Sequence, residues 1–436
     1  MKRYPEYKDS GIPWAGSIPA SWTVKKLKYS FLYHQGGAWG EEAIGDENDR
    51  ICIRVADFDY PRLSIAEKDY TIRNYTSSQI QKLTIFPGDL LIEKSGGGET
   101  TPVGRVVLFD KDFQSLYANF LEAIRVKDDH SSRFYKYIFS VLFYVGVNKL
   151  HFNQTTGIQN LNVGKYLGEK VPIPLLTQQE KIADYLDQKT AIIDELISHK
   201  AELVDLLYEK RISIICSAVT KGIDSTAEMK DSGNEWLGYI PSHWRVVPAK
   251  ALFAQSKEIR HETDVQLTAS QKYGIISQED YMERQNYKIV LADKGLENWK
   301  HVEPNDFIIS LRSFQGGLEI SYIPGCITWH YIVLKPKAGV EPEYFKWLFK
   351  SPRYIQALQR TANFIRDGQD LRFSNFVQVP LPLIPMDEQK EIAEYLNKKT
   401  ARIDSIIADI TEQIEKLKEY RQSVISEVVT GKVAVE

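Results

Sequence analysis

Hydrophobic positions near the end of the sequence recur with a seven-residue period. One row consists of Leu396, Ile403, Ile410, Leu417 and Val424. A second row, four residues further along, consists of Thr400, Ile407, Ile414, Arg421 and Val428. Two such rows over about five heptads predict the apolar seam of a coiled-coil helix. At 1.5 Å per residue, this helix would extend over roughly 60 Å.

A segment in the middle of the chain repeats this pattern 210 residues earlier. Its apolar seam positions are Leu186, Ile193, Ile197, Val204, Leu207 and Ile214. Lys200 interrupts the seam, and Arg211 stands at the position that corresponds to Arg421. The two arginines are interpreted either as polar markers of helix register or as side chains that extend to the helix surface. Because the two segments match in length and period, we expect their helices to pair with each other. The alternative is that each helix packs on its own globular domain.

A shorter block also occurs twice, once before each variable region. Lys8-Asp9-Ser10-Gly11 recurs as Lys230-Asp231-Ser232-Gly233, at an offset of 222. The residues that follow, Trp14, Gly16, Ile18, Pro19 and Trp22, recur as Trp236, Gly238, Ile240, Pro241 and Trp244. Residues 30–165 and 252–375, which lie between the repeated blocks, differ from each other. A duplicated frame with two different inserts predicts one scaffold that presents two recognition surfaces.

The two inserts combine short β-like runs with helix-like stretches. Residues 86–92 (FPGDLLI) have a counterpart in residues 303–309 (EPNDFII), so we expect the inserts to share one fold. Prolines before each long helix predict extended backbone there. We therefore predict an α+β protein with two globular domains of mixed structure, separated by two long antiparallel helices, and with a pseudo-two-fold internal repeat. The predicted boundaries are 1–170 and 224–379 for the domains, and 171–223 and 380–436 for the helices.

Composition places the chain among globular proteins. Of its 436 residues, 43% are hydrophobic and 26% are charged, which argues against disorder along most of the chain. Apolar runs are shorter than the roughly 18 residues needed to cross a bilayer, and the first segment lacks the apolar core of a signal peptide. Cys52, Cys216 and Cys326 are far apart, which argues against a disulfide framework or a CxxC metal site. We expect a reduced, cytoplasmic protein.

Charge differs between the helical segments and the remainder. The chain has 55 basic and 58 acidic residues, a net charge of −3. Residues 178–222 hold 6 basic and 8 acidic residues, and residues 386–436 hold 8 and 11. The remainder therefore has 41 basic and 39 acidic residues. This distribution weakly favours nucleic-acid binding by the globular parts, because Lys and Arg make the phosphate contacts.

Polar residues that are able to contact phosphates or base edges gather in both inserts. Arg, Asn and Gln can each make two hydrogen bonds with guanine or adenine. The candidates in the first insert are Lys94, Ser95, Gly97, Thr100, Arg105, Asn153, Gln154, Thr155, Thr156, Gln159 and Asn160. The candidates in the second insert are Lys257, Arg260, Arg312, Ser313, Gln315, Arg366, Gln369 and Arg372. An ordinary polar loop is the competing interpretation for each of these residues.

The order of the motifs resembles that of the specificity subunits of type I restriction–modification systems. Each copy has KDSG-x-x-W-x-G-x-IP-x-x-W, a variable block, a P-x-P segment, and Q-x-x-IA-x-YL-x-x-KT-x-x-ID leading into a long helix. The resemblance extends over essentially the whole chain. It implies two target recognition domains, each of which reads one half of a bipartite, asymmetric site in double-stranded DNA. It also implies that the paired helices set the length of the unread spacer.

The same resemblance implies partners for this chain. Two modification (methyltransferase) subunits would dock on the helices, and restriction (translocase and nuclease) subunits would join through them. Those partners would bind S-adenosylmethionine, and ATP with Mg²⁺ where a restriction subunit is present. The chain itself is expected to hold no cofactor and no metal, to lack catalytic residues and to have no membrane association.

An enzyme is the first alternative to a binding subunit. A DNA methyltransferase would need an (N/D)PP(Y/F) motif, and neither PPY nor PPF occurs in the sequence. Gly96, Gly97 and Gly98 lack the strand–turn–helix context of a dinucleotide loop, and GxxxxGK(S/T) is absent. The eight histidines form no HExxH or paired ligand pattern. The second alternative is a coiled-coil protein–protein adaptor without DNA specificity. Selection from a random duplex library would distinguish this adaptor from a DNA specificity subunit.

Overall fold

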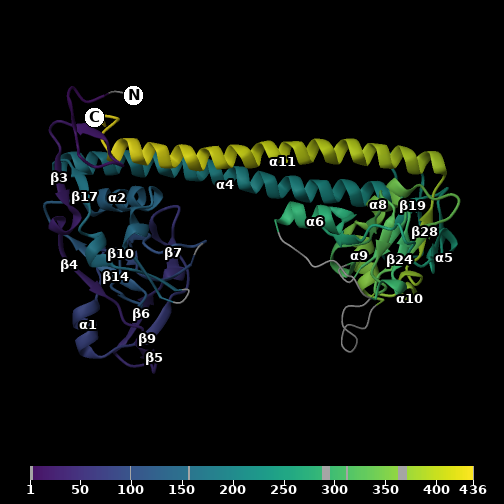
Figure 1. Cartoon of the computed structure of the whole chain (residues 1–436), viewed down its shortest axis with the longest axis horizontal. Coiled ribbons are helices and arrows are strands. Elements are labelled where there is room, and N and C mark those ends of the chain that lie inside the picture. Colours follow the sequence, from purple (N-terminus) through teal and green to yellow (C-terminus); the bar gives the residue numbers. More distant parts are fainter. Residues whose placement is uncertain are drawn as a thin grey trace. The chain divides into compact units, whose positions relative to one another are not determined.

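The computed structural model of the chain is an α+β structure, as the sequence predicted (Figure 1). It describes residues 3–98, 100–155, 158–286, 295–310, 313–361 and 371–435, with the backbone alone for Gln154 and Thr155. The chain divides into two compact units. The first unit consists of Met1–Glu202 and Thr411–Glu436, and the second unit consists of Leu203–Ile410.

Two long helices, α4 (Leu176–Lys221) and α11 (Met386–Val429), each contribute one half to each unit. In the first unit, Asp194 of α4 contacts Arg421 of α11, and Lys200 contacts Gln413, so the helix halves are antiparallel. In the second unit, Arg211 of α4 contacts Asp404 of α11. The expected pairing of the two helices is therefore present inside each unit.

The residues of the predicted seam are buried or half-buried in the structure. In the first unit Leu186, Ile193 and Val424 are 0%, 6% and 4% exposed, and in the second unit Leu396 is 0% exposed. Three further seam residues are buried: Ile403, Ile407 and Ile410. Six others are half-buried: Ile197, Val204, Leu207, Ile214, Ile414 and Leu417. Exclusion of these rows from water is the main force expected to hold the helices together.

The proline segments before the helices are extended, as predicted, and each contributes one paired strand. Strand β17 (Lys170–Ile173) pairs with β3 (Thr23–Lys26) in the first unit, and β29 (Leu381–Leu383) pairs with β20 (Arg245–Val247) in the second. Each helix begins after its strand and therefore later than predicted, because proline favours extended backbone. The domain boundaries given above stay a prediction.

A glutamine in the first turn of each helix joins the helix to its globular part. In the first unit, Gln179 donates to Pro174 O at 2.9 Å and accepts from Ser131 N at 2.9 Å. In the second unit, Gln389 donates to Ile384 O at 2.8 Å and accepts from Glu341 N at 2.8 Å. Both glutamines are 1% exposed. The repeated sequence therefore builds the same buried junction twice.

A four-stranded antiparallel sheet forms the centre of the first unit. Its strand order is β12 (Val106–Leu108), β10 (Leu90–Glu93), β14 (Leu121–Val126) and β4 (Phe31–Gly36). Alternate side chains of β10 face opposite sides of the sheet. Leu90 and Ile92 join the core under helix α2 (Ser132–Tyr144), whereas Leu91 joins a second core on the other face.

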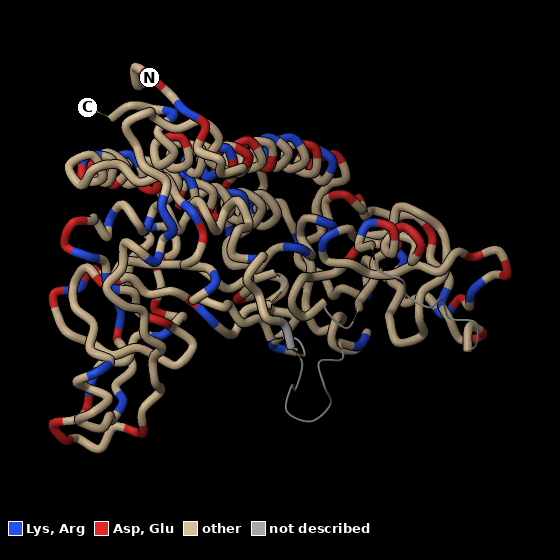
Figure 2. The backbone as a smooth tube through the Cα atoms, turned by 60° about the vertical axis from the view of Figure 1, so that its left-hand side comes forward, with Lys and Arg blue, Asp and Glu red and all other residues tan. Residues whose placement is uncertain are grey.

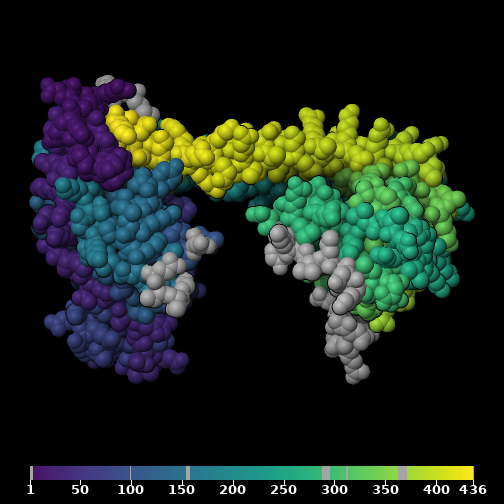
Figure 3. All heavy atoms as spheres, in the orientation of Figure 1, coloured from purple at the N-terminus to yellow at the C-terminus, as the bar shows by residue number. Residues whose placement is uncertain are grey.

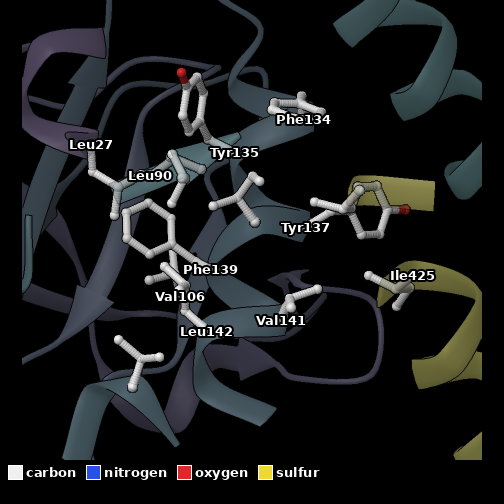
Figure 4. Close-up of a cluster of buried hydrophobic side chains, with 14 of the residues drawn as sticks. Leu27, Leu90, Val106, Phe134, Tyr135, Tyr137, Phe139, Val141, Leu142 and Ile425 are labelled. Atoms are coloured by element: carbon white, nitrogen blue, oxygen red, sulfur yellow. The ribbon is translucent and has the colours of Figure 1, made fainter. Parts of the chain in front are cut away.

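Helix α2 places aromatic residues in the core of the first unit. Figure 4 shows Phe139 and Leu142 of α2 close to Leu90 and Val106 of the sheet. On the other side of α2, Tyr137 and Val141 point toward Ile425 of α11 (Figure 4). The helix is thus packed between the sheet and the long helix.

The second unit repeats this sheet. Its strand order is β21 (Phe253–Gln255), β28 (Ile332–Pro336), β25 (Phe307–Ile309) and β26 (Glu319–Ile320). Phe307 and Ile309 face one core, whereas Ile308 faces another. Helices α8 (Pro342–Phe349) and α9 (Pro352–Gln359) contribute to the larger core. The expectation that the two inserts share one fold is therefore confirmed.

The repeated N-terminal motifs form equivalent hairpins, β1 (Tyr7–Asp9) with β2 (Ser17–Pro19) and β18 (Met229–Asp231) with β19 (Tyr239–Pro241). In the first, Gly11 N donates to Asp9 Oδ1 at 3.0 Å, and in the second Gly233 N donates to Asp231 Oδ1 at 2.9 Å. The first hairpin lies against the C-terminal end of α11, where the Tyr7 hydroxyl donates to Gly431 O at 3.1 Å (Figures 1 and 3).

The remaining elements are short. In the first unit they are β5 (Glu41–Glu42), β6 (Asp49–Ile53), β7 (Phe58–Asp59), β8 (Ser64–Ile65), β9 (Thr71–Asn74), α1 (Ser77–Leu83), β11 (Ser95–Gly97), β13 (Leu116–Tyr117), β15 (Phe152–Thr155), β16 (Ile158–Leu161) and α3 (Val163–Tyr166). In the second unit they are α5 (Ala249–Leu252), β22 (Leu267–Ser270), β23 (Gly274–Ser277), α6 (Gln278–Gln285), β24 (Lys300–Val302), α7 (Ser313–Gly316), β27 (Gly325–Ile327) and α10 (Phe373–Phe376).

Candidate nucleic-acid interface

The first unit brings its two polar segments together in one small sheet. Strands β11, β16 and β15 lie side by side in that order. Ser95 of β11 is paired with Asn160 of β16, and Asn160 is paired in turn with Asn153 of β15. The Ser95 hydroxyl donates to Asn160 Oδ1 at 2.5 Å. Candidates that are more than fifty residues apart in the sequence therefore share one surface, which we call the polar sheet.

Glycines allow this sheet to form close to the chain that follows it. Gly96 has a φ of +99°, a backbone conformation that favours glycine. A Cβ on Gly97 would lie 2.6 Å from Thr101 O and 2.7 Å from Val103 Cγ1, so a larger residue would force the strand outward. Thr100 is exposed. Gly96 and Gly97 are thus part of strand β11, and their lack of a side chain allows this strand to lie close to Thr101 and Val103.

Asn153 and Gln159 of the polar sheet differ in exposure. Asn153 is exposed, whereas Gln159 is 8% exposed, and its Oε1 has no hydrogen-bond partner among the described residues. A buried amide oxygen without a hydrogen-bond partner lowers the stability of the fold, because it has lost its hydrogen bonds to water. Gln154 and Thr155 lie on β15 by their backbone, and Thr156 lies outside the described residues.

Two basic candidates flank the polar sheet in different environments. Lys94 is half-buried, and its Nζ lies 3.8 Å from Glu122 Oε2. The Arg105 guanidinium lies over the ring of Tyr60 at 4.2 Å and near the ring of Phe143 at 5.3 Å. Arg105 is thus held by aromatic packing.

The environment of Arg105 also includes a buried carboxyl group. Burial raises the pKa of Glu93 to about 7, although the nearby Arg105 charge and a hydrogen bond from Tyr60 act in the opposite direction. A carboxyl that titrates near neutral pH is unusual, because desolvation must outweigh a neighbouring cation.

The candidates of the second unit occupy several elements. Ser313 is the first residue of α7; it is 1% exposed, and its Oγ accepts from Ser310 N at 2.9 Å. Gln315 of α7 is exposed. Arg372 precedes α10, where its backbone N–H donates to Asn375 Oδ1 at 3.0 Å. Lys257 is exposed and Arg260 is half-buried in the connection between β21 and β22. Three further candidates lie outside the described residues: Arg312, Arg366 and Gln369.

A cavity of about 690 Å³ in the second unit contains residues that the sequence reasoning missed. Gln315 lines it together with Gln271 and Lys272 of the β22–β23 hairpin region. Lys346 and Lys350, one turn apart on and after α8, contribute two cations. Lys350 forms an ion pair with Glu319, and Lys346 Nζ lies 2.7 Å from Glu343 Oε2. Two lysines four residues apart on a helix were the sequence signal for this cationic surface.

The seam arginines form reciprocal ion pairs. In the first unit Arg421 Nε lies 2.8 Å from Asp194 Oδ1, and in the second unit Arg211 Nε lies 2.8 Å from Asp404 Oδ1. Because Arg211 matches Arg421 and Asp194 matches Asp404 at the offset of 210, the two pairs are equivalent by the internal repeat. Each arginine also reaches its globular part: Arg421 donates to Pro61 O, and Arg211 lies 5.8 Å from the ring of Trp347.

Helix α4 exposes a pair of apolar residues in each unit. In the first unit Ile192 and Leu196 are 60% and 43% exposed, and in the second unit Leu203 and Leu206 are 45% and 60% exposed. A spacing of four or three residues places the two members of each pair on the same side of the helix. The positions 210 residues later are Arg402, Ile406, Gln413 and Lys416. The repeat therefore preserves the seam but changes these exposed positions. Elsewhere on both long helices, charged residues of both signs are interspersed (Figure 2).

A further group of polar side chains in the second unit could hold a metal ion. One ligand atom from each of Glu258, His261 and His301 lies within 4.8 Å of the others. The sequence separates the two histidines by forty residues, so no spacing motif indicates this group.

These observations define a class of protein. Its chain contains the same α+β scaffold twice, each copy is followed by one long helix, and each copy carries its own polar surface. Residues 56–205 and 241–416 match the family described as type I restriction modification DNA specificity domain. The chain belongs to this family, whose members are non-catalytic specificity subunits. The resemblance seen in the motifs is thus confirmed.

Individual relatives agree with this assignment. The type I restriction enzyme MjaVIII specificity subunit of Methanocaldococcus jannaschii is 22% identical over 448 residues, which cover 96% of this chain and 94% of the relative. The EcoKI specificity subunit of Escherichia coli K12 is 18% identical over 440 residues, which cover 97% and 91%.

Solved structures show the same fold. A chain from work on complex assembly and conformational transition of the type I R-M system has a TM-score of 0.68 at 14% identity, with coverage of 95% of this chain and 99% of that chain. The HsdS subunit of Thermoanaerobacter tengcongensis has a TM-score of 0.52 at 14% identity, with coverage of 95% and 98%. Among the helices that the structure describes, none has the length and apolar character required to cross a membrane.

Proposed function

We propose that each unit reads one half of a bipartite, asymmetric site in double-stranded DNA, in the cytoplasm, and that the long helices set the spacer between the halves. The observation that carries this proposal is the repeated scaffold with unlike surfaces. Asp89 and Asp306 directly precede equivalent strands of equivalent sheets, whereas the polar sheet of the first unit and the cationic cavity of the second carry different side chains.

The polar sheet supplies the chemistry that base reading requires. Asn153 and Asn160 carry amide groups that can pair with adenine, and Lys94 lies directly before β11. Gln159 has an unpartnered Oε1, which an incoming donor group such as the cytosine amino group would satisfy after a local side-chain movement. In the second unit, Lys257, Arg260, Gln315 and Arg372 take the same role.

The helical seam is suited to keep a fixed distance. Each long helix has 44 or 46 residues, which corresponds to about 66–69 Å at 1.5 Å per residue. Two domains that contact the same face of B-DNA lie about 34 Å apart, which is one helical turn, or a multiple of this distance. The reciprocal Arg–Asp pairs oppose sliding of one helix along the other, because a shift would separate each arginine from its carboxylate, at the larger cost for the more buried Arg421–Asp194 pair.

The helices also supply the docking surface for two modification subunits. The exposed residues Ile192 and Leu196 of the first unit, and Leu203 and Leu206 of the second, are the apolar parts of this surface on α4. Burial of such residues at an interface would be favourable, since apolar side chains contribute roughly 25 cal/mol per Å² removed from water. On α11 the matching positions are largely polar, so the second modification subunit would make a different set of contacts.

The partners would carry the catalytic chemistry. S-adenosylmethionine would be bound by the modification subunits, and ATP with Mg²⁺ by restriction subunits that join through them. This chain would supply sequence selection alone, in keeping with its family.

Selection of bound duplexes from a random pool, with the chain assembled with its methyltransferase, tests the proposal. We expect enrichment of two unlike short motifs with a fixed gap. A variant with one extra heptad in both helices adds about 10 Å, so its gap should lengthen by about three base pairs at 3.4 Å each, with both motifs unchanged. Altered motifs in this variant would contradict the spacer role.

The alternative, a coiled-coil adaptor without DNA specificity, is the other outcome of the same selection. In that case the assembled complex would bind the pool without enrichment, while the methyltransferase still co-purified with the chain.

A further inference from the structure

A cluster of imidazole and carboxylate groups lies beside the central sheet of the second unit. His301, in β24, is 3% exposed. His261, in the connection between β21 and β22, stacks on it with ring centroids 3.9 Å apart. Glu258 Oε1 lies 3.3 Å from His261 Nε2. The three residues each offer a ligand atom within 4.8 Å of the others.

The backbone holds both segments of this cluster in place. His301 N donates to Glu258 O at 3.1 Å, and Arg260 N donates to Trp299 O at 2.9 Å. The connection that carries Glu258 and His261 is thus joined to β24 by main-chain hydrogen bonds. Main-chain hydrogen bonds, and not side-chain contacts alone, therefore position the residues that carry the ligand atoms.

A second carboxylate orients His301. Its Nδ1 lies 2.8 Å from Asp264 Oδ2, and the Asp264 side chain is 6% exposed. Histidines that bind a metal ion almost always donate their other ring N–H to a carboxylate or carbonyl, which fixes the tautomer. If Asp264 accepts from Nδ1, the lone pair of Nε2 is available to a cation.

The other ring nitrogen meets a further acceptor. His301 Nε2 lies 2.7 Å from Glu303 Oε1. A nitrogen lone pair and a carboxylate oxygen at this distance repel each other unless a proton or a cation lies with them. Three carboxylates, Glu258, Asp264 and Glu303, surround the two rings, and Lys335, 3.3 Å from Glu258 Oε2, offsets one of these charges.

We propose that Glu258, His261 and His301 bind one Zn²⁺ ion, with Asp264 as the carboxylate that orients His301. Two imidazoles and a carboxylate are a donor set that suits zinc. A divalent cation also balances the excess of negative charge around the rings. The ion would join the β21–β22 connection to β24, and its role would be structural, because the sequence reveals no catalytic motif near it.

The first unit lacks this donor set at the matching positions. Alignment of Pro87-Gly88-Asp89 with Pro304-Asn305-Asp306 places Thr84 opposite His301 and Phe86 opposite Glu303. The backbone is equivalent there, since Ile85 bridges to Ser115 as Val302 pairs with Gly325. The site is therefore a property of the second insert and not of the repeated scaffold.

The position of the ion has a consequence for DNA reading, which rests on the proposed function. Lys257 and Arg260 flank Glu258 in the same connection. A bound ion would hold these two cations in one arrangement and reduce the entropy lost when they contact phosphates.

Titration of the chelator-treated full chain with ZnCl₂ in the absence of DNA tests the site, with a metal indicator as competitor and elemental analysis for stoichiometry. We expect one ion per chain, and an affinity reduced by at least about tenfold in H261A and E258A. D264N should weaken binding by roughly 10–100-fold, as loss of an orienting carboxylate does in other metal sites.

A matched control is His243, which is 50% exposed and lies 2.8 Å from Glu388 Oε2, as His261 is 52% exposed beside Glu258. H243A should bind zinc as the unmodified chain does. The ion should also raise the Tm of the unmodified chain but not that of H261A, because a ligand stabilises the fold that binds it. Absence of binding, or equal affinity in the unmodified chain and H261A, would overturn the proposal. Because no DNA is present, this result is independent of whether the chain selects a sequence.

Discussion

Both units place an aspartate in the turn before an equivalent strand of the central sheet, but the basic residue that pairs with this aspartate differs. In the first unit Asp89 accepts from Phe86 N at 2.9 Å and pairs with Arg125, whose Nε lies 2.7 Å away. In the second unit Asp306 accepts from Glu303 N at 2.9 Å, but its cation is Lys335, at 3.7 Å. The aspartate, the turn and the strand are retained, whereas the basic partner is exchanged.

The cation has an electrostatic consequence for its aspartate. Burial raises the pKa of Asp306, and the hydrogen bond from Glu303 N and the charge of Lys335 offset this only in part. An ammonium at 3.7 Å stabilises a buried carboxylate less than a guanidinium with two close contacts does. The repeat thus fixes backbone geometry and leaves side-chain chemistry free to differ, as the two unlike reading surfaces proposed above would require.

Exchange of one insert is expected to have the largest effect, because it replaces the surface of one unit and leaves that of the other unchanged. If residues 30–165 are replaced by the corresponding insert of another family member, we expect one half of the recognised site to change completely and the other half to stay. The reason is that Gln179 and Gln389, with the carbonyl groups of Pro174 and Ile384 that they bind, lie outside the exchanged segment and are internal to separate units. Selection from a random duplex pool measures the outcome, and a change in both halves would show that the units do not read independently.

Substitution of Glu93 tests a difference at equivalent strand ends. The first unit has Glu93 where the second has Ser310. The pKa of Glu93 is raised to about 7, so in the folded protein the carboxyl stays neutral at pH values where the unfolded chain has lost the proton. The folded state therefore binds more protons, and its stability falls as pH rises from about 4.5 to 7.

We expect E93Q to lose this dependence. The free energy of unfolding of E93Q, relative to that of the unmodified chain, should rise by roughly 2–3 kcal/mol across that pH interval, at about 1.36 kcal/mol per pH unit. Above this interval the difference should remain constant. Urea unfolding at pH 4.5, 6 and 8 provides the measurement. E42Q, at an exposed position of β5, serves as the control and should show no such trend. A constant difference between E93Q and the unmodified chain would contradict the assignment.

The equivalent ion pairs of the seam offer a finer comparison. Asp194 and Arg421 are 19% and 12% exposed, whereas Asp404 and Arg211 are 50% and 28% exposed. D194N leaves a largely buried guanidinium without its charge partner, and we expect a cost of about 2 kcal/mol. D404N should cost less than about 1 kcal/mol, because solvent screens an exposed pair. Urea unfolding of the two variants compares them, and equal costs would show that burial does not separate the pairs.

Much of the scaffold could be predicted from sequence. The seven-residue period identified the seam from Leu396 to Val424, and the repeated motifs identified the duplication and the family. The matching FPGD and EPND segments identified equivalent turns and strands. These features were accessible because they depend on local periodicity, on proline geometry and on the comparison of one half of the chain with the other.

The candidate site was accessible only in part. The sequence indicated Ser95 and Asn160 as polar candidates, but not that β11 and β16 would place them side by side. It did not reveal that Arg105 packs on Tyr60, or that Lys272, Lys346 and Lys350 line one cavity. The DNA-contacting role of the individual residues stays a prediction.

The amino-acid sequence by itself determined the double scaffold, the long helices and the family, because each follows from residues that are neighbours in the chain or copies of one another. Tertiary structure alone decided which distant side chains meet: Asp194 with Arg421, and His261 with His301. Such contacts depend on strand register and helix packing, in which a shift of one residue turns a side chain to the opposite face. No spacing rule along the chain encodes them.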